Sequence, residues 1–173
     1  FTPSATPHVY LTCHPGRQQE YGIDIIEVIA DQVPEVTFHV YGISKSFHQM
    51  WTGRTGQIYN HQYANQLNII YHGKIPTEQF DKEIQHYHAA LRLNKHDGMA
   101  ETLAKSVLMG QYPISAIPYP DITHVNINRS YMPLINALNE LKNHERPNFI
   151  AAENWRNRLN ENLCRLLYWG WRN

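Results

Sequence analysis

The sequence lacks most of the features that mark secreted, membrane-spanning or metal-binding proteins. It has two cysteines in 173 residues, Cys13 and Cys164, far apart and in apolar segments. We expect both to be buried free thiols, which suits a reducing cytoplasm. No apolar run reaches the roughly 18 residues of a membrane helix, and no signal peptide is visible. The 11 histidines follow neither HExxH nor paired CxxC spacing, so we expect no bound metal.

The sequence also lacks net charge, because 15 Lys and Arg residues balance 15 Asp and Glu residues. The totals therefore give no support for a nucleic-acid partner or for a membrane surface. Hydrophobic residues make up 42% of the chain and charged residues 17%, as in soluble globular proteins. We expect one domain over residues 1–173, with a sizeable core and no insertion into a membrane.

Strand-like and helix-like segments alternate along the chain. Short, nearly continuous apolar runs predict strands at residues 8–13, 36–42, 67–73, 89–94 and 112–117. Apolar residues at helical spacing predict helices at residues 23–33, 76–88, 99–109 and 150–169. A further helix is expected within residues 127–143, with Pro133 in its first turn. Residues 43–66 read as a long loop with room for a short helix. The alternation predicts an α/β fold, a three-layer Rossmann-like parallel sheet with helices on both faces.

Ligands of such sheets bind at the carboxyl ends of the strands. This rule selects the loops HPGR (14–17), YG (41–42), HGK (72–74) and KHDG (95–98), which all follow predicted strands. The chain has no Walker loop and no GxGxxG motif.

The KHDG loop precedes a predicted helix. Free backbone amides at Gly98, Met99 and Ala100 would attract a phosphate, and Gly98 would let a ligand approach closely. Asp97 can accept hydrogen bonds from sugar hydroxyls, while His96 can donate or accept. The alternative is that Asp97 only caps the helix.

The HPGR loop and the strand exit at HGK offer further contacts. Gly16 belongs to a turn, and Arg17 carries a forked cation that suits a diphosphate. The alternative for Arg17 is a surface ion pair with Glu20 or Asp24. The turn from Gly73 to Ile75 exposes its backbone to a nucleotide base, unless it is a plain strand exit.

Together these motifs resemble the C-terminal, donor-binding domain of GT-B glycosyltransferases of the glycosyl transferases group 1 type. The resemblance covers nearly the whole chain. The segment CHPGRQQEYGIDIIEVIA is similar to the family's Gly-Arg loop, Lys-Gly pair and helix, and VTFHVYG to its second strand. The segment IIYHGKIPTEQFDKEIQHYHAALRL is similar to its next strand, Gly-x-Val/Ile turn, helix and strand. The segment HDGMAETLAKSVLMGQYPIS is similar to its acidic-Gly loop, helix and Gly-x-Pro-Val/Ile element.

The resemblance implies one half of a GT-B fold and a nucleoside-diphosphate sugar as substrate, with no further cofactor and no metal. Arg17 would contact the diphosphate, Asp97 the sugar hydroxyls, and the backbone of 98–100 the phosphate or sugar. The turn at 73–75 would lie near the base. The complete nucleotide-sugar set is Gly16, Arg17, Tyr21, Gly42, Gly73, Ile75, His96, Asp97, Gly98, Met99, Ala100 and Lys105.

The resemblance also implies a metal-independent, hexosyltransferase-like reaction on an unidentified acceptor, with retention the commoner outcome. Acceptor-side groups would come from an N-terminal domain absent from this chain. We therefore assign no catalytic base and expect no turnover from this piece alone. Residues 150–173 would form a helix that packs on that domain, or that serves the ordinary core. The expected location is the cytoplasm, with a peripheral membrane position of the full-length protein as an alternative.

Two positions depart from the family pattern. The family has two acids separated by seven residues; Asp97 fits the first, and Lys105 stands at the second. Lysine cannot accept hydrogen bonds from ribose hydroxyls, so Lys105 would pair with a phosphate or with Asp97. Tyr21 stands where the family has a phosphate-binding lysine. The alternative function is a non-catalytic GT-B-like domain that has lost donor binding and serves as a partner-binding module.

Overall fold

The computed structural model describes residues 6–46, 67–94 and 101–170, with residues 161–170 described as backbone. The strands are β1 (His8–Thr12), β2 (Thr37–Tyr41), β3 (Ile69–Gly73), β4 (Ala89–Arg92), β5 (Ile114–Ser115) and β6 (Thr123–His124). The α-helices are α1 (Ile23–Ile29), α3 (Thr77–Ile84), α4 (Glu101–Leu108), α5 (Met132–Glu140) and α6 (Phe149–Gly170). Short 3-10 helices follow two of them, η1 (Ala30–Gln32) and η3 (Leu141–Asn143).

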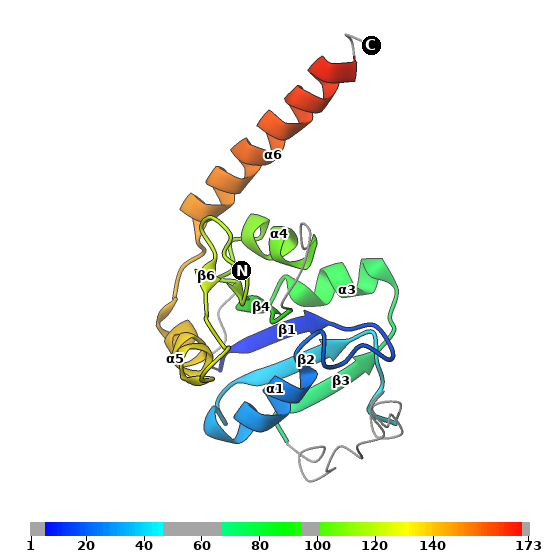
Figure 1. The fold of residues 1–173 in the computed structure, drawn as a ribbon, viewed down its shortest axis with the longest axis vertical. Helices are drawn as coiled ribbons and strands as arrows, with labels where there is room; N and C mark the ends of the chain where they lie inside the picture. The colour runs from blue at the N-terminus through cyan, green and yellow to red at the C-terminus, as the bar shows by residue number, and fades with distance from the viewer. Residues whose placement is uncertain (1–5, 47–66, 95–100, 171–173) are drawn as a thin grey trace.

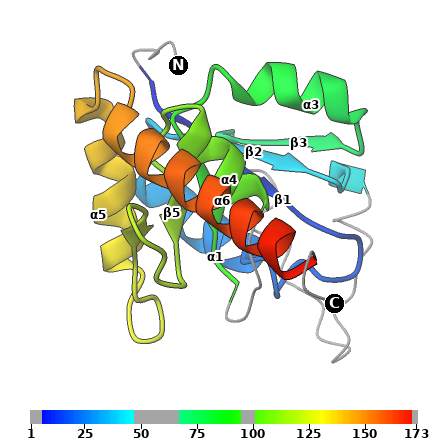
Figure 2. The same ribbon diagram turned by 90° about the horizontal axis from the view of Figure 1, so that it is seen from above.

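The strands form one parallel sheet in the order β3-β2-β1-β4-β5-β6. Helices α1 and α5 cover one face, and α3, α4 and α6 lie on the other (Figure 1, Figure 2). The predicted three-layer Rossmann-like fold is therefore confirmed. This topology brings the carboxyl ends of β1, β2, β3 and β4 to the same edge.

The central strands are apolar on both faces because helices cover both. Along β1, Val9 and Leu11 belong to the core under α1 and α5, whereas Tyr10 belongs to the core under α3, α4 and α6. Successive side chains of a strand point to opposite faces, so a continuous apolar run fills two cores at once. Both cores are densely buried, with Val9 and Tyr10 fully excluded from solvent.

The observed boundaries differ from the predicted ones mainly at the far edge of the sheet. Strand β5 is limited to two residues, and the equally short β6, which pairs with it, was not predicted. Both side chains of β6 are exposed, so it carries no apolar signal. The helix expected within residues 127–143 runs from Met132 to Glu140, and the prediction that Pro133 lies in its first turn is confirmed. Most of the loop expected at 43–66 lies outside the described residues.

Gly42 lets the ends of β1 and β2 come together. It adopts a left-handed conformation, with φ of 94°, and a Cβ at this position would overlap the carbonyl oxygen of Cys13. The backbone N–H of Cys13 donates to the Tyr41 carbonyl at 2.8 Å, and that of Gly42 donates to the Gly73 carbonyl at 2.7 Å. A larger residue at 42 would push apart the strand ends that carry the candidate loops.

Substitution of Gly42 by alanine should therefore destabilise the fold more than the same change at Gly73. Gly73 is also left-handed, with φ of 72°, but within the described ranges a Cβ there would meet only Ser44, at 3.9 Å. We expect Gly73→Ala to cost about 1 kcal/mol of unfolding free energy, the left-handed penalty alone. Gly42→Ala should cost about 3 kcal/mol, because a backbone displacement is added. Urea unfolding measures both, and equal losses would contradict the close approach at Gly42.

Histidines on three adjacent strands interrupt the apolar face that α3 covers. His8 Nδ1 lies 2.8 Å from His39 Nε2, and His39 Nδ1 lies 2.9 Å from His72 Nε2. We call His8, His39 and His72 the histidine ladder. Burial, and then the neighbouring His72 and His8, lower the pKa of His39 to about 3. Burial also lowers the pKa of His8 and of His72.

This ladder makes stability fall in acid. An unfolded histidine binds a proton near pH 6.5, whereas folded His39 does so only near pH 3. Between these values the unfolded chain holds more protons, so the unfolding free energy decreases as pH falls from about 6.5 toward 3. One such group contributes a slope of up to about 1.4 kcal/mol per pH unit.

We expect His39→Phe to flatten the fall of stability between pH 6 and 4, because phenylalanine fills the site without titrating. Urea unfolding at several pH values measures the slope. His86→Gln, which changes an exposed histidine next to Tyr87, should keep the wild-type slope. An unchanged slope in His39→Phe would show that the buried ladder is not the source of acid sensitivity.

Candidate functional site

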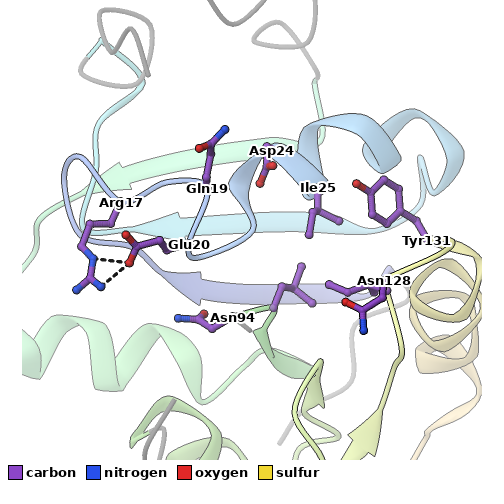
Figure 3. A pocket seen from close by; sticks show the side chains of 10 residues that line it. Arg17, Gln19, Glu20, Asp24, Ile25, Asn94, Asn128 and Tyr131 are labelled. Atoms are coloured by element: carbon purple, nitrogen blue, oxygen red, sulfur yellow. Dashed lines mark hydrogen bonds and ion pairs between the residues drawn. The ribbon is translucent and has the colours of Figure 1, made fainter. Parts of the chain in front are cut away.

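A hollow lies on each side of the carboxyl end of β1. The α3 hollow, of about 550 Å³, is lined by Thr12, Cys13, His14, Pro15, Tyr41, Gly42, Lys74, Ile75, Thr77, Phe80 and Glu101. The α1 hollow, of about 730 Å³, is lined by Arg17, Gln19, Glu20, Asp24, Ile25, Leu93, Asn94, Ile127, Asn128 and Tyr131 (Figure 3). Both volumes lie in the range of small-molecule sites. The two hollows are thus the places where strand-end residues meet a ligand-sized space.

Arg17 stands at the rim of the α1 hollow. Its guanidinium forms an ion pair with Glu20, in which Arg17 Nε lies 2.6 Å from Glu20 Oε2 (Figure 3). Both side chains are more than half exposed, at 59% and 53%, and hydrogen bonding to Glu20 raises the pKa of Arg17. The ion pair with Glu20 is therefore the arrangement of the free chain. A diphosphate would have to compete with this exposed carboxylate, which is a weak competitor.

Two buried amide side chains belong to the segments that line this hollow: Asn94 lines it directly, and Gln18 lies in the sequence between the lining residues Arg17 and Gln19. Gln18 is 2% exposed and Asn94 is 8% exposed. Among the described residues, neither polar atom of the Gln18 amide has a hydrogen-bond partner, and the same holds for Oδ1 of Asn94, which lines the α1 hollow. A buried amide left unpaired costs about 1–3 kcal/mol. Because Oδ1 of Asn94 accepts hydrogen bonds, it would gain from a ligand that offers a hydroxyl donor in the hollow.

Tyr21 is held between other side chains rather than open to a ligand. The Arg92 guanidinium lies 4.9 Å from the centroid of its ring, and the His14 ring meets it edge-on at 5.8 Å. Gly22, with φ of 76°, follows and is the N-cap residue of α1. Tyr21 stands where the family pattern has a lysine and carries no charge itself, but the Arg92 guanidinium supplies a positive charge next to its ring.

The α3 hollow brings together the predicted residues of β2 and β3. Gly73 donates its backbone N–H to the Ile43 carbonyl at 3.0 Å and accepts from Gly42. Gly42 and Ile75 both line the hollow, and Gly73 lies between them along this hydrogen-bonded turn. Lys74 adds an exposed cation at the same turn. The turn from 73 to 75 thus combines open backbone, an apolar side chain and a positive charge.

Cys13 lies on the floor of the α3 hollow and is a free, buried thiol, as expected. Burial raises its pKa to about 12. The thiol therefore stays protonated near neutral pH and does not act as a nucleophile. The side chain of Cys164 lies outside the described part of the chain.

Lys105 forms ion pairs with two acidic side chains, neither of which the sequence analysis considered as its partner. Its Nζ lies 2.8 Å from Asp81 Oδ1 and 3.2 Å from Glu101 Oε1. The hydrogen bond to Asp81 raises the pKa of Lys105. The pair with Glu101 follows the i,i+4 spacing of a helix and was visible in the sequence. The pair with Asp81 joins α4 to α3 and requires the fold.

Some of the predicted site residues lie in or next to the two hollows, and others lie outside the described residues. Arg17 belongs to the α1 hollow, Gly42 and Ile75 belong to the α3 hollow, and Gly16 forms the turn before Arg17 with φ of 81°. The predicted sugar-site residues His96, Asp97, Gly98, Met99 and Ala100 lie outside the described residues.

Sequence reasoning missed several residues of the edge. Lys74 belongs to the HGK loop that the strand-end rule selected, but it was not assigned a contact. Asn94 ends the strand predicted at 89–94, directly before the KHDG loop, and was not selected. Glu101 and the buried Gln18 gave no such signal, because only the fold shows that one lines a hollow and the other is buried. Tyr41 belongs to the YG loop that the strand-end rule selected, where only Gly42 was assigned to the site, and the structure shows that Tyr41 also lines the α3 hollow.

The described residues contain no cluster of three or more His, Cys, Asp or Glu side chains arranged to hold a metal ion. Within the same residues, no helix has both the length and the apolar character that a membrane crossing needs.

No protein-family model matches the chain, and no curated protein matches it in sequence. Solved structures do match. Sucrose-phosphate synthase from Thermosynechococcus elongatus superposes with a TM-score of 0.64 at 15% identity, over 97% of this chain and 47% of that one. HepE from Anabaena, solved in complex with UDP and glucose, gives 0.58 at 13% identity, over 93% of this chain and 49% of that one.

The C-terminal domain of the glycosyl transferase group 1 family protein LpcC from Francisella tularensis gives a TM-score of 0.58 at 12% identity. The match covers 92% of this chain and 87% of that domain. The chain thus spans about half the length of the two longer glycosyltransferases and nearly all of the isolated domain. These likenesses confirm the resemblance at the level of the fold: the chain has the fold of the C-terminal domain of GT-B glycosyltransferases.

Proposed function

We propose that this glycosyltransferase-like domain is the donor-substrate domain of a glycosyltransferase and binds a nucleoside-diphosphate sugar along the carboxyl edge of its sheet. The observation that carries the proposal is the pair of hollows on either side of β1, with an exposed cation at each. In one of them Oδ1 of Asn94 also has no hydrogen-bond partner among the described residues. A nucleotide sugar has an aromatic base, a diphosphate and a polyhydroxylated ring, and this edge offers a partner for each. The complex of HepE with UDP and glucose supports the choice of ligand, since HepE shares the fold.

The chemistry of each hollow assigns the parts of the ligand. The base suits the α3 hollow, where Ile75 and Phe80 give apolar contacts and the turn around Gly73 offers backbone groups. The diphosphate suits the rim near Arg17, whose forked guanidinium can leave Glu20 for two phosphate oxygens. The sugar then points toward the loop at residues 96–100, as the resemblance implies.

The residues of this chain would stabilise the leaving diphosphate rather than attack the sugar. Arg17 and Lys74 supply positive charge where negative charge develops as the glycosyl bond breaks. Lys105 does not contribute in this arrangement, because Asp81 and Glu101 hold its amine. No metal is required for this step. The acceptor and the group that activates it would be bound by a second domain. The two longer solved structures, about half of which this chain covers, have room in their sequences for such a domain.

Helix α6 is the element that we propose to contact that second domain, together with the residues up to 173. Its first turns serve the core, since Trp155 is 6% exposed and donates its indole N–H to the Pro120 carbonyl at 2.8 Å. Beyond them α6 runs away from the sheet (Figure 1). Phe149 and Ile150 at its start are 71% and 77% exposed.

One specific observation favours the alternative, a non-catalytic domain that has lost donor binding and serves as a partner-binding module. Both departures from the family pattern are engaged elsewhere: Lys105 is ion-paired, and Tyr21 is stacked against Arg92. A site that has lost both groups would bind a donor weakly or not at all. The two functions differ in whether a nucleotide stabilises the chain.

Thermal unfolding with UDP, GDP, ADP, TDP and CDP at millimolar concentration distinguishes them. A ligand at about ten times its dissociation constant adds roughly 1.4 kcal/mol of stability. For a domain of this size that is a shift of about 2–4 °C. We expect one of the five nucleotides to give such a shift, and Arg17→Ala to abolish it.

The controls separate binding from folding. Arg17→Ala without ligand should unfold at the wild-type temperature, because its ion pair with Glu20 is exposed. Arg146→Ala removes an exposed arginine near Gly110, at the opposite edge of the sheet, and should keep the full shift. If no nucleotide shifts either this chain or the full-length protein, the donor-binding function is contradicted and the non-catalytic alternative holds.

A further inference from the structure

The histidine ladder runs diagonally across the sheet toward the α3 hollow. His39 pairs in register with Tyr10, two residues beyond His8. His72 lies between the residues that pair with Val40 and Tyr41, closer again to the carboxyl ends. Alternation along each strand places the three rings on the face that α3 covers. The ladder therefore connects the amino end of β1 with the edge that carries the hollows.

The hydrogen bonds of the ladder must all point the same way. A neutral imidazole has one N–H and one acceptor nitrogen. His39 uses both of its nitrogens, Nε2 toward His8 and Nδ1 toward His72. If His8 donates, His39 must donate in turn to His72; if His72 donates, the order is reversed. The ladder thus has two directions and switches between them only as a unit.

Glu83 of α3 is the carboxylate at which this network ends. Its Oε2 lies 3.8 Å from Nδ1 of His72 and accepts a hydrogen bond from the Tyr41 hydroxyl at 2.7 Å. The Tyr87 hydroxyl bridges the two branches, at 3.1 Å from His39 Nδ1 and 2.9 Å from the Tyr41 hydroxyl. Gln79 occupies the other oxygen of Glu83 at 2.8 Å.

We propose that the histidine ladder is a proton wire: it takes up one proton at His8, delivers it to His72 beside Glu83, and thereby couples pH to the wall of the α3 hollow through Tyr41. A solvent proton bonds to Nε2 of His8. The Nδ1–H bond of His8 then breaks as an Nε2–H bond forms on His39, and the Nδ1–H bond of His39 breaks as an Nε2–H bond forms on His72. The net change is one added proton, which leaves His72 as an imidazolium and reverses the ladder.

His72 is the ring that keeps the proton. It is 22% exposed, it faces the Glu83 carboxylate, and it stacks on the Tyr41 ring with centroids 4.3 Å apart, which favours a cation. His39 is 6% exposed and only passes the proton on. The other titratable groups packed around the ladder are Tyr10, Tyr87, His88 and the Asp81–Lys105 pair.

Protonation of His72 changes what Glu83 binds. The imidazolium attracts Oε2 of Glu83, which in the neutral ladder is the acceptor of the Tyr41 hydroxyl. Tyr41 lines the α3 hollow, so a loosened Tyr41 alters the surface that a ligand meets there. The buried wire itself does not depend on the proposed function.

A histidine and tyrosine NMR titration between pH 8 and 5 tests the wire. We expect the His72 ring to titrate and the Tyr41 Cζ resonance, assigned with Tyr41→Phe, to shift with the same midpoint. Glu83→Gln should lower the His72 midpoint and remove the Tyr41 response, because a neutral amide does not move toward the imidazolium. His86→Gln is the matched control and should leave both resonances unchanged.

His39→Phe tests the path. In the wild type His8 and His72 should change together, as one proton reverses both rings, whereas in His39→Phe each should titrate with its own midpoint. The proposal is overturned if His8 and His72 already titrate independently in the wild type, or if Tyr41 does not respond to His72.

A binding measurement tests the coupling, and this arm alone rests on the proposed function. The nucleotide that stabilises the chain should bind about threefold more weakly at pH 5.5 than at pH 7.5, in line with the loss of one anchoring hydrogen bond. The pH-dependent loss of affinity in the wild type is compared with that in Glu83→Gln, because the other titrating groups of the protein and of the nucleotide are the same in both. If no nucleotide binds at either pH, the proposed function fails and the NMR titration still decides the wire. If the nucleotide binds with equal pH dependence in both proteins, the coupling to the hollow is overturned.

Discussion

The close approach of β1 and β2 at their carboxyl ends is the constraint on which the rest of the structure depends. Gly42 lies against the Cys13 carbonyl, where no side chain fits, and its N–H reaches the Gly73 carbonyl on the next strand. This contact draws three strand exits to one edge. The parallel register then places a cation and a hollow on each side of β1. A ligand site at this edge is therefore a consequence of how the sheet closes.

The same register builds the histidine ladder on the face of the sheet under α3. Strands β1, β2 and β3 contribute one histidine each. Each ring lies within hydrogen-bond distance of the next only because these strands are parallel neighbours in this order. The ladder ends at Glu83 and Tyr41, and Tyr41 also lines the α3 hollow. One backbone arrangement thus sets both the candidate ligand site and a chain of titrating groups that leads to it.

Much of the fold could be predicted from sequence, because the apolar runs and the helical periods are strong signals in this chain. The strand-end rule also selected the loops that contain Arg17 and Gly42, and Ile75 follows a third such loop; the structure shows that all three residues line the hollows. Contacts between distant segments could not be predicted. The Lys105–Asp81 pair and the ladder depend on strand order and helix placement, and a two-residue strand such as β6 has no periodicity to detect. Of the contacts of Lys105, the i,i+4 spacing could have predicted the pair with Glu101, although the sequence analysis proposed a phosphate or Asp97 instead.

The most direct measurement of the central claim is amide chemical-shift mapping of the 15N-labelled chain with UDP and the other nucleoside diphosphates. The account predicts that the perturbed amides cluster at residues 13–22, 42–43, 73–75 and 93–94, on both sides of β1. Perturbations centred on the amino ends of the strands, such as residues 35–37 and 110–113, would contradict it. So would a full titration with all five nucleoside diphosphates in which no amide resonance shifts.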